Sequence, residues 1–232
     1  MTPTEQLVVS EVFGPTFQGE GRSIGRRAGF VRLGRCNLAC AFCDTPYTWR
    51  WEDHDPAAEL THTTVPAIVA RLEAMGVELV VVTGGEPLLQ QRRLVSLARE
   101  IARRGWECEI ETAGTIAPAA DLVPLVSRFN VSPKLANSAN PQDQRYKPAV
   151  LGAFESTGRA SFKFVACDPE DLDEVQAMVE DCGLGDVWVM PEGTEPTVLL
   201  ERSRRLAEPV LARGWHLTTR LHVLLWGDVR GR

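Results

Sequence analysis

The sequence of 232 residues has no window of 18 consecutive apolar residues and no basic, apolar leader at its N-terminus. The first absence argues against a membrane-spanning helix, and the second argues against a secreted protein. Basic residues are also fewer than acidic ones, 25 against 31, so the net charge is −6. Such a chain lacks the positive field that neutralises nucleic-acid phosphates. We therefore expect a cytoplasmic protein that binds neither nucleic acid nor a membrane.

Internal repeats, low-complexity tracts and interdomain linkers are absent as well. The composition, with 44% hydrophobic and 24% charged residues, is that of an ordinary globular protein. The length suits one α/β domain with a core of its own. The sequence thus predicts a single domain over residues 1–232.

Short β-branched runs alternate with longer segments of helical periodicity, which is typical of βα units. Six runs are expected to form parallel strands, at residues 28–33, 77–82, 106–111, 129–132, 161–166 and 186–190, and residues 217–225 are expected to form a closing strand. This rhythm predicts an α/β fold whose parallel sheet is wound as an incomplete (βα)6 barrel. An open Rossmann-like sheet is the alternative.

Three of the six cysteines lie within eight residues, as Cys36, Cys40 and Cys43. The spacing C-x3-C-x2-C allows one loop to wrap three soft thiolate ligands around a metal centre. Structural zinc sites usually have four protein ligands, and His54 and His62 are not at customary spacing to complete one. A cubane iron-sulfur cluster held by three thiolates leaves one iron open for a reactive cofactor. A zinc-binding module that adds His54 or Asp44 remains the alternative.

The cysteine loop, with Phe42 before its last cysteine, resembles the signature of radical S-adenosylmethionine (SAM) enzymes. The segment Thr83-Gly84-Gly85-Glu86-Pro87 follows the second strand and resembles the glycine-rich segment of that superfamily. The resemblance implies a [4Fe–4S] cluster on the three cysteines that reduces SAM and releases a 5'-deoxyadenosyl radical. Glycines let the backbone approach a ligand, and a carboxylate can bind the ammonium group of SAM.

The resemblance also assigns further cofactor-binding residues, because strand ends are where α/β barrels place ligand contacts. Ser132 and Lys134, after the fourth strand, rank above Glu111 among them. The expected cofactor-binding residues are Phe42, Asp44, Gly84, Gly85, Glu86, Ser132 and Lys134.

The segment before the cluster distinguishes between radical SAM enzymes. The residues Thr16-Phe-Gln-Gly-Glu-Gly21, Gly25-Arg26, Phe30-Val-Arg-Leu33 and Cys43-Asp-Thr45 resemble the 7-carboxy-7-deazaguanine synthase family. That resemblance implies a carbon-nitrogen lyase that converts 6-carboxy-5,6,7,8-tetrahydropterin to 7-carboxy-7-deazaguanine with loss of ammonia, a step of queuosine and 7-deazapurine biosynthesis. We expect residues 13–33 to recognise the substrate and residues 36–43 to hold the cluster.

The chemistry of a tetrahydropterin fits these side chains. Gln18 and Glu20 can pair with its aminopyrimidinone edge, and Arg26 can bind its carboxylate through two hydrogen bonds. The family also uses Mg²⁺, which the resemblance assigns to Thr45. The expected substrate-binding residues are Phe17, Gln18, Gly19, Glu20, Arg26, Thr83 and His222.

The resemblance implies two kinds of protein partner, a reductant such as flavodoxin or ferredoxin and a second copy of the chain in a homodimer. A radical SAM activase of a glycyl radical enzyme shares the cysteine spacing and is a further alternative, although it would not need Gln18, Glu20 or Thr45. Whether the product serves tRNA modification or a deazapurine natural product is open at this stage. The tail after His222 has no assigned role.

Overall fold

The computed structural model describes residues 6–231 and has one sheet of nine strands. The strands are β1 (Gln6–Phe17), β2 (Arg27–Leu33), β3 (Thr61–Thr64), β4 (Leu79–Gly84), β5 (Glu107–Thr112), β6 (Arg128–Val131), β7 (Ala160–Ala166), β8 (Val187–Pro191) and β9 (His216–Leu217). Their order across the sheet is β3-β1-β2-β4-β5-β6-β7-β8-β9, and all pairs from β2 onward are parallel.

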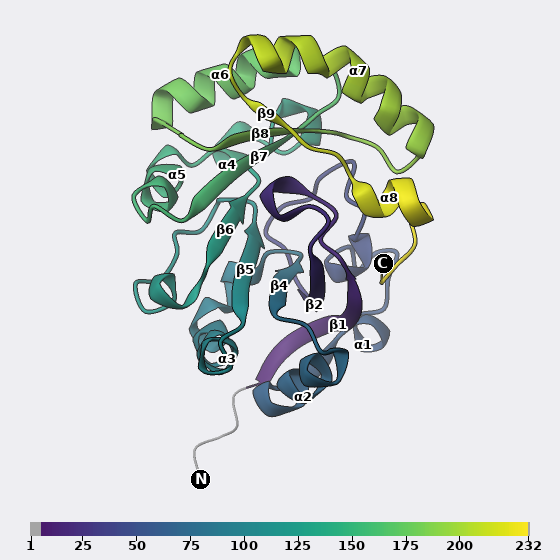
Figure 1. The fold of residues 1–232 in the computed structure, drawn as a ribbon, viewed down its shortest axis with the longest axis vertical. Helices are drawn as coiled ribbons and strands as arrows, with labels where there is room; N and C mark the ends of the chain where they lie inside the picture. Colours follow the sequence, from purple (N-terminus) through teal and green to yellow (C-terminus); the bar gives the residue numbers. More distant parts are fainter. Residues whose placement is uncertain (1–5, 232) are drawn as a thin grey trace.

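This order confirms the mostly parallel α/β fold. Each parallel strand is added beside the previous one, so the order never reverses as it does in a Rossmann sheet. The six strands expected from the sequence are β2, β4, β5, β6, β7 and β8. Each observed strand end lies within two residues of the expected one. Figure 1 shows the curved sheet with helices along its outer side.

The helices are α1 (Pro56–Glu59), α2 (Val65–Met75), α3 (Gln91–Arg103), α4 (Gln142–Arg145), α5 (Pro148–Glu155), α6 (Asp171–Cys182), α7 (Pro196–Ala212) and α8 (Leu221–Trp226). Short 3-10 turns are η1 (Gly21–Ser23), η2 (Pro46–Thr48), η3 (Pro87–Gln90), η4 (Val123–Leu125) and η5 (Ala136–Ser138). Among residues 6–231, none of these helices combines the length and apolar composition needed to cross a bilayer.

Strand β4 shows how the core is built on both faces of the sheet. Val80 and Val82 pack outward with helices α2 and α3, whereas Leu79 and Val81 pack inward with Phe30. A parallel strand buried on both faces needs the continuous apolar run that the sequence shows here. Helix α2 begins directly after Thr64, whose side chain accepts a hydrogen bond from the Ala67 amide.

Two N-terminal strands were not predicted. Strands β1 and β3 pair antiparallel to each other, and β1 also pairs antiparallel to β2. The Gly14–Pro15 pair interrupts the strand pattern of β1, and its pairing register shifts between Phe13 and Thr16. The segment 49–62 contains α1 and the beginning of β3.

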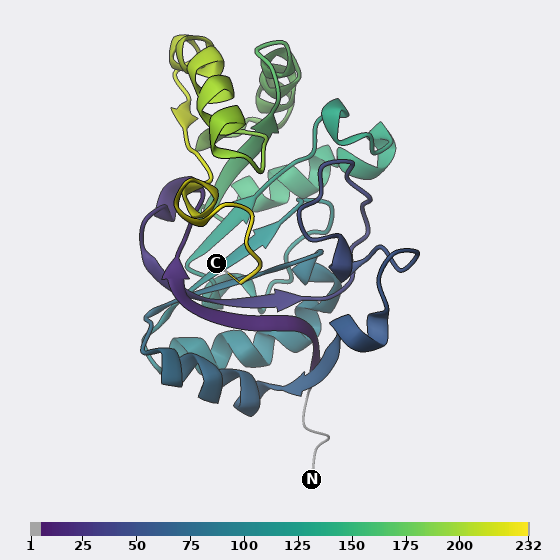
Figure 2. The same ribbon diagram turned by 90° about the vertical axis from the view of Figure 1, so that its right-hand side faces the viewer.

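The expected closing strand at residues 217–225 is wrong. Only His216–Leu217 is a strand there, and Leu221–Trp226 forms helix α8. Short apolar runs do not distinguish strand from helix by periodicity, which is why the prediction failed. In Figure 2, α8 and the C-terminal residues lie against β1 and the turn that follows it.

Candidate active site

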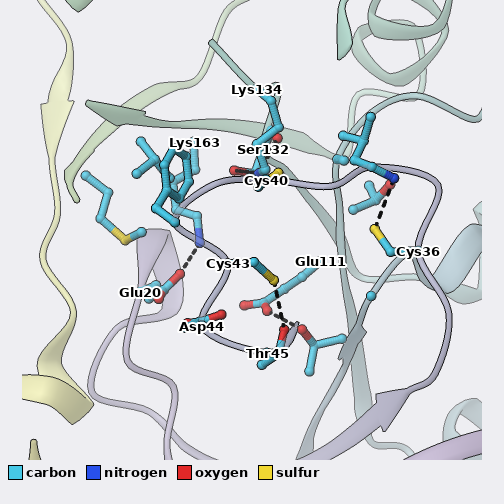
Figure 3. Close-up of a pocket in the computed structure, with 18 of the residues that line it drawn as sticks. Glu20, Cys36, Cys40, Cys43, Asp44, Thr45, Glu111, Ser132, Lys134 and Lys163 are labelled. Carbon is cyan, nitrogen blue, oxygen red and sulfur yellow. Dashed lines mark hydrogen bonds and ion pairs between the residues drawn. The ribbon is translucent and has the colours of Figure 1, made fainter. Parts of the chain in front are cut away.

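Two adjoining pockets lie at the carboxyl ends of the parallel strands. The larger has an empty volume of about 970 Å³ and the smaller about 610 Å³. Both are lined by Glu20, Asp44, Thr45, Thr83, Gly84 and Glu111, so the two pockets adjoin. This is where α/β barrels bind ligands, because the strand-end loops converge there. Figure 3 shows the labelled side chains that face into this space.

The three clustered cysteines line the larger pocket. Each thiol accepts one N–H group: Cys36 from the Leu38 amide at 3.5 Å, Cys40 from Asn140 at 3.2 Å, and Cys43 from the Trp49 indole at 3.2 Å. Within residues 6–231, no three His, Cys, Asp or Glu side chains converge on the position of one metal ion. In a four-iron cluster each thiolate binds a different iron, so the donor set of three thiols fits that group.

Burial raises the pKa of Cys36 to about 11, so this thiol is protonated at neutral pH when no metal is bound. Metal binding then displaces the proton, since the thiolate is the ligand. Cys40 is similarly affected, because burial raises the pKa of its thiol. The remaining cysteines, Cys108, Cys167 and Cys182, do not line either pocket.

Gly84 and Gly85 line the larger pocket. Glycine is needed at both positions because of the neighbouring backbone, and not, as expected, because a ligand approaches closely. A Cβ at Gly84 would lie 2.2 Å from the Leu33 carbonyl oxygen, and one at Gly85 would lie 2.1 Å from that of Arg35. Gly84 also has φ of +149°. The absence of side chains therefore lets the end of β4 pack against the backbone that leads into the cysteine loop.

Glu86 is not in the pocket, contrary to expectation. Its side chain is fully buried and accepts hydrogen bonds from the Leu88 amide, the Ala113 amide and the Thr112 hydroxyl. Burial raises the pKa of Glu86, and these hydrogen bonds offset the rise in part. Its carboxylate thus holds the ends of β4 and β5 together rather than facing a ligand.

Ser132, Lys134 and Phe42 all line the larger pocket, as expected. The Lys134 ammonium donates to the carbonyl and the hydroxyl oxygen of Ser132, at 2.8 and 2.9 Å. These bonds fix a positive charge and a hydroxyl at the end of β6, a combination that can bind a carboxylate.

A buried network of charges crosses the floor of the site. The Glu20 carboxylate accepts hydrogen bonds from the Lys163 ammonium and from Arg220 Nε, the latter at 3.2 Å. Arg220 also forms an ion pair with Asp44. Burial alone would raise the pKa of Glu20, but the charges of Lys163 and Arg220 hold it well below its ordinary value. Burial alone would lower the pKa of Lys163, but the charges of Glu20 and Glu111 and the hydrogen bond to Glu20 together raise it. Glu20, Lys163 and Arg220 are therefore charged at neutral pH.

Glu111 has a larger role than the sequence suggested. It accepts hydrogen bonds from Gln18 Nε2 at 3.1 Å and from the Thr83 hydroxyl at 2.7 Å, so it joins the N-terminal segment to β4 and β5. Glu109, two residues earlier on the same face of β5, accepts from Ser23 and Asn130. The alternation of glutamates with apolar residues in β5 was the available signal for this polar inner face.

Arg26 does not reach the site. Its guanidinium forms a two-bond pair with Glu107, and both side chains are about half exposed, at 44% and 50%. Glu107 begins β5 whereas Glu111 lies near its end, so the pair sits about 13 Å along the strand from the pocket. The arginine that lines the smaller pocket is Arg32, whose Nε donates to Glu11 at 2.7 Å. This bond leaves the terminal nitrogens of Arg32 for a ligand.

The remaining expected residues surround the smaller pocket, which is lined by Phe17, Gln18, Gly19, Thr45, Thr83 and His222 among others. A Cβ at Gly19 would lie 2.0 Å from Nδ1 of His222, so any side chain there would displace the ring. Burial lowers the pKa of His222, which keeps the imidazole neutral at pH 7. His222 belongs to helix α8, not to the strand expected from the sequence.

Lys163, Arg220 and Arg32 were not among the expected site residues. Lys163 lies within a strand of otherwise apolar character, and a charged residue at such a position was the signal for an inward-facing group. Arg32 lies inside the segment 13–33 that was expected to recognise the substrate, but it was not singled out there. Arg220 gave no comparable signal, because only the fold brings it to the pocket.

Comparison with known proteins agrees with this site. The radical SAM superfamily model matches residues 31–147, which include all three cysteines. A 7-carboxy-7-deazaguanine synthase of Pyrobaculum aerophilum is 38% identical over the full length of both chains. One from Halobacterium salinarum is 35% identical over 96% of this chain and 91% of that one.

A solved structure agrees as well. The crystal structure of QueE from Escherichia coli superposes with a TM-score of 0.71 at 26% identity, covering 94% of this chain and 95% of the other. A shared cysteine loop alone, as in a zinc module or an activase, would not produce matches of this extent. The chain belongs to the radical SAM superfamily, whose members carry a [4Fe–4S] cluster and SAM, and within it to the family of 7-carboxy-7-deazaguanine synthases.

Proposed function

We propose that the protein contracts the ring of 6-carboxy-5,6,7,8-tetrahydropterin to 7-carboxy-7-deazaguanine with loss of ammonia, and that the described chain acts as one catalytic domain. The observation that carries the proposal is the pair of adjoining pockets: the three cysteines line the larger one, Gln18 and Gly19 line the smaller one, and Glu20 lines both. A reaction between two bound molecules requires such juxtaposition.

The cysteine side of the site would hold the cofactors. Cys36, Cys40 and Cys43 would hold the [4Fe–4S] cluster, and Ser132 and Lys134 would bind the carboxylate of SAM. When bound and reduced, the cluster supplies the electron that cleaves SAM to a 5'-deoxyadenosyl radical able to take hydrogen from the substrate. Phe42 would pack against the bound nucleoside.

The other side would hold the pterin. Gln18 and Glu20 are fixed by Glu111, Lys163 and Arg220, so their polar atoms are oriented before a substrate arrives. Such fixed donors and acceptors suit the aminopyrimidinone edge of the ring. His222, held neutral by burial, can donate or accept one further hydrogen bond.

Thr45 would supply one oxygen to Mg²⁺. It is buried and lines both pockets, between the cluster ligands and the substrate segment. Magnesium typically keeps several water or ligand oxygens and few protein ones, so a single threonine with the substrate carboxylate would suffice. The metal would stabilise negative charge on that carboxylate.

Family membership supports two further parts of the proposal, a homodimer and an electron donor such as flavodoxin or ferredoxin. The function is tested by incubating anaerobically reconstituted protein with SAM, a reductant, Mg²⁺ and 6-carboxytetrahydropterin. We expect 7-carboxy-7-deazaguanine and released ammonia, identified by mass and by an ammonia assay. Uncoupled SAM cleavage without conversion of the pterin would contradict the proposed substrate.

Arg32, rather than Arg26, is expected to bind the substrate carboxylate. Replacing Arg32 with lysine removes the two-bond geometry, and losing a charge-assisted hydrogen bond of about 1.5–3 kcal/mol should raise KM roughly ten- to a hundredfold. The matched variant Arg26→Lys should change KM by less than about twofold, since an exposed pair such as Arg26–Glu107 contributes about 0–1 kcal/mol, and only to stability. Equal effects on KM in steady-state assays would refute this assignment.

A further inference from the structure

Two side chains outside the cysteine motif donate hydrogen bonds to its thiols. The indole Nε1 of Trp49 lies 3.2 Å from Cys43 Sγ, and the amide Nδ2 of Asn140 lies 3.2 Å from Cys40 Sγ. The third thiol, that of Cys36, receives only the Leu38 backbone amide at the longer distance of 3.5 Å. Side-chain donors therefore act on two of the three thiols.

Asn140 is held in place by the cysteine loop itself. Its Oδ1 accepts from the Ala39 amide at 2.9 Å, so the two ends of one side-chain amide contact consecutive residues of the loop. The neighbouring Ser138 carbonyl accepts from the Ala41 amide at 3.0 Å. Residues 138–140 thus bind the loop from a segment that is 100 positions further along the chain.

Trp49 is oriented independently of Asn140. Its backbone amide donates to the Pro46 carbonyl at 3.0 Å, which closes the turn η2 after the cysteine loop. The guanidinium of Arg50 lies over the indole, 5.0 Å from the ring centre. The indole N–H therefore points at Cys43 from a ring with restricted freedom, and the ring also lines the larger pocket.

We propose that Trp49 and Asn140 are positioning residues that raise the reduction potential of the cluster by hydrogen bonding to two of its thiolates. The inference rests on the proposed function, since it presupposes the cluster on these cysteines. Reduction places more negative charge on the cluster and its sulfur ligands, so N–H donors stabilise the reduced state more than the oxidised one. Loss of a donor shifts the potential to a more negative value.

The test is a dithionite titration of anaerobically reconstituted protein, monitored by electron paramagnetic resonance of the reduced cluster. Trp49→Phe keeps an aromatic ring and removes the N–H, and we expect a more negative midpoint potential. Trp51→Phe is the matched control, because this indole is two residues away and 39% exposed. Its potential should equal that of the unmodified protein. On transfer from H2O to D2O, the unmodified protein should lose the signal of an exchangeable proton that is coupled to the cluster. Trp49→Phe should lack this signal already in H2O.

Asn140→Asp provides a second, independent variant. The carboxylate can still accept from the Ala39 amide but presents a negative oxygen to Cys40, so the negative shift should exceed that of Trp49→Phe. Iron and sulfide analysis separates the two possible failures. Unmodified protein without stoichiometric iron and sulfide would overturn the proposed function. Variants with a full cluster and an unchanged reduction potential would overturn only this inference. Loss of the cluster from both variants would also overturn it, because the two contacts would then be purely structural.

Discussion

Replacing Cys40 with alanine is expected to abolish both SAM cleavage and product formation, and to reduce bound iron and sulfide to a small fraction of the reconstituted value. Cys40 is a buried thiol on the pocket wall and one of the three ligands proposed for a cluster that most proteins hold with four. Two thiolates cannot fix a cubane, so the site loses the group that starts the reaction. Anaerobic iron and sulfide analysis, together with a 5'-deoxyadenosine assay, measures both effects.

Cys167→Ala is the matched control for this variant. Cys167 lies outside both pockets, in contact with Asn137 Nδ2 at 3.9 Å, and no cluster ligand is near it in the chain. Its removal should leave iron content and turnover within about twofold of the unmodified protein, because a substitution away from the site acts only through stability. Full activity of the Cys40 variant would show that the cluster is held elsewhere.

Glu20→Gln is expected to lower the free energy of unfolding at pH 7 by about 3–5 kcal/mol and to weaken substrate binding strongly. Glu20 is the shared partner of Lys163 and Arg220, and removing one member of a buried ion pair leaves the opposite charge uncompensated. Urea unfolding at equilibrium gives the first quantity and substrate titration gives the second. The exposed pair offers the control: Glu107→Gln should cost only about 0–1 kcal/mol.

The stability difference between unmodified protein and the Glu20→Gln variant should depend on pH. Lys163 and Arg220 hold the pKa of Glu20 below its unfolded value, although burial opposes them. The charged carboxylate therefore contributes its full stabilisation above the unfolded pKa of about 4.3, and loses it as pH falls toward the folded value. We expect the difference at pH 7 to exceed that at pH 3.5. A gap that widens on acidification would contradict the direction of this pKa shift.

The parallel part of the fold was predictable because short, strand-like runs alternate with helical segments along the chain. Leu79–Val82 is an example, since these four residues are apolar and buried between both faces of the sheet. The antiparallel strand β1 was not predictable in the same way, because the Gly14–Pro15 pair and the two register shifts interrupt its pattern. Helix α8 was mistaken for a strand because six residues are too few for a helical period to emerge.

The site residues also differ in how well the sequence alone predicts them. Residues adjacent in sequence, such as the cysteine loop and the Gln18–Glu20 segment, carried their signal in local spacing. Arg26 looked equally local, yet it directly precedes β2 and pairs with Glu107, the first residue of β5, at the amino-terminal ends of the parallel strands. Glu86 matched a motif, but its carboxylate is used inside the protein. Such positions depend on which way a side chain faces, and a motif does not record that direction.

The bond between Glu20 and Arg220 joins residues 200 positions apart. A ribosome makes the chain from its N-terminus, and early segments can fold while later ones are still being added. The cysteine loop consequently leaves the ribosome long before Arg220 has been added to the chain. During that interval Lys163, and not Arg220, is the first cation available to Glu20. The charge network around Glu20 is therefore completed last in biosynthesis, after the three cysteines have already left the ribosome.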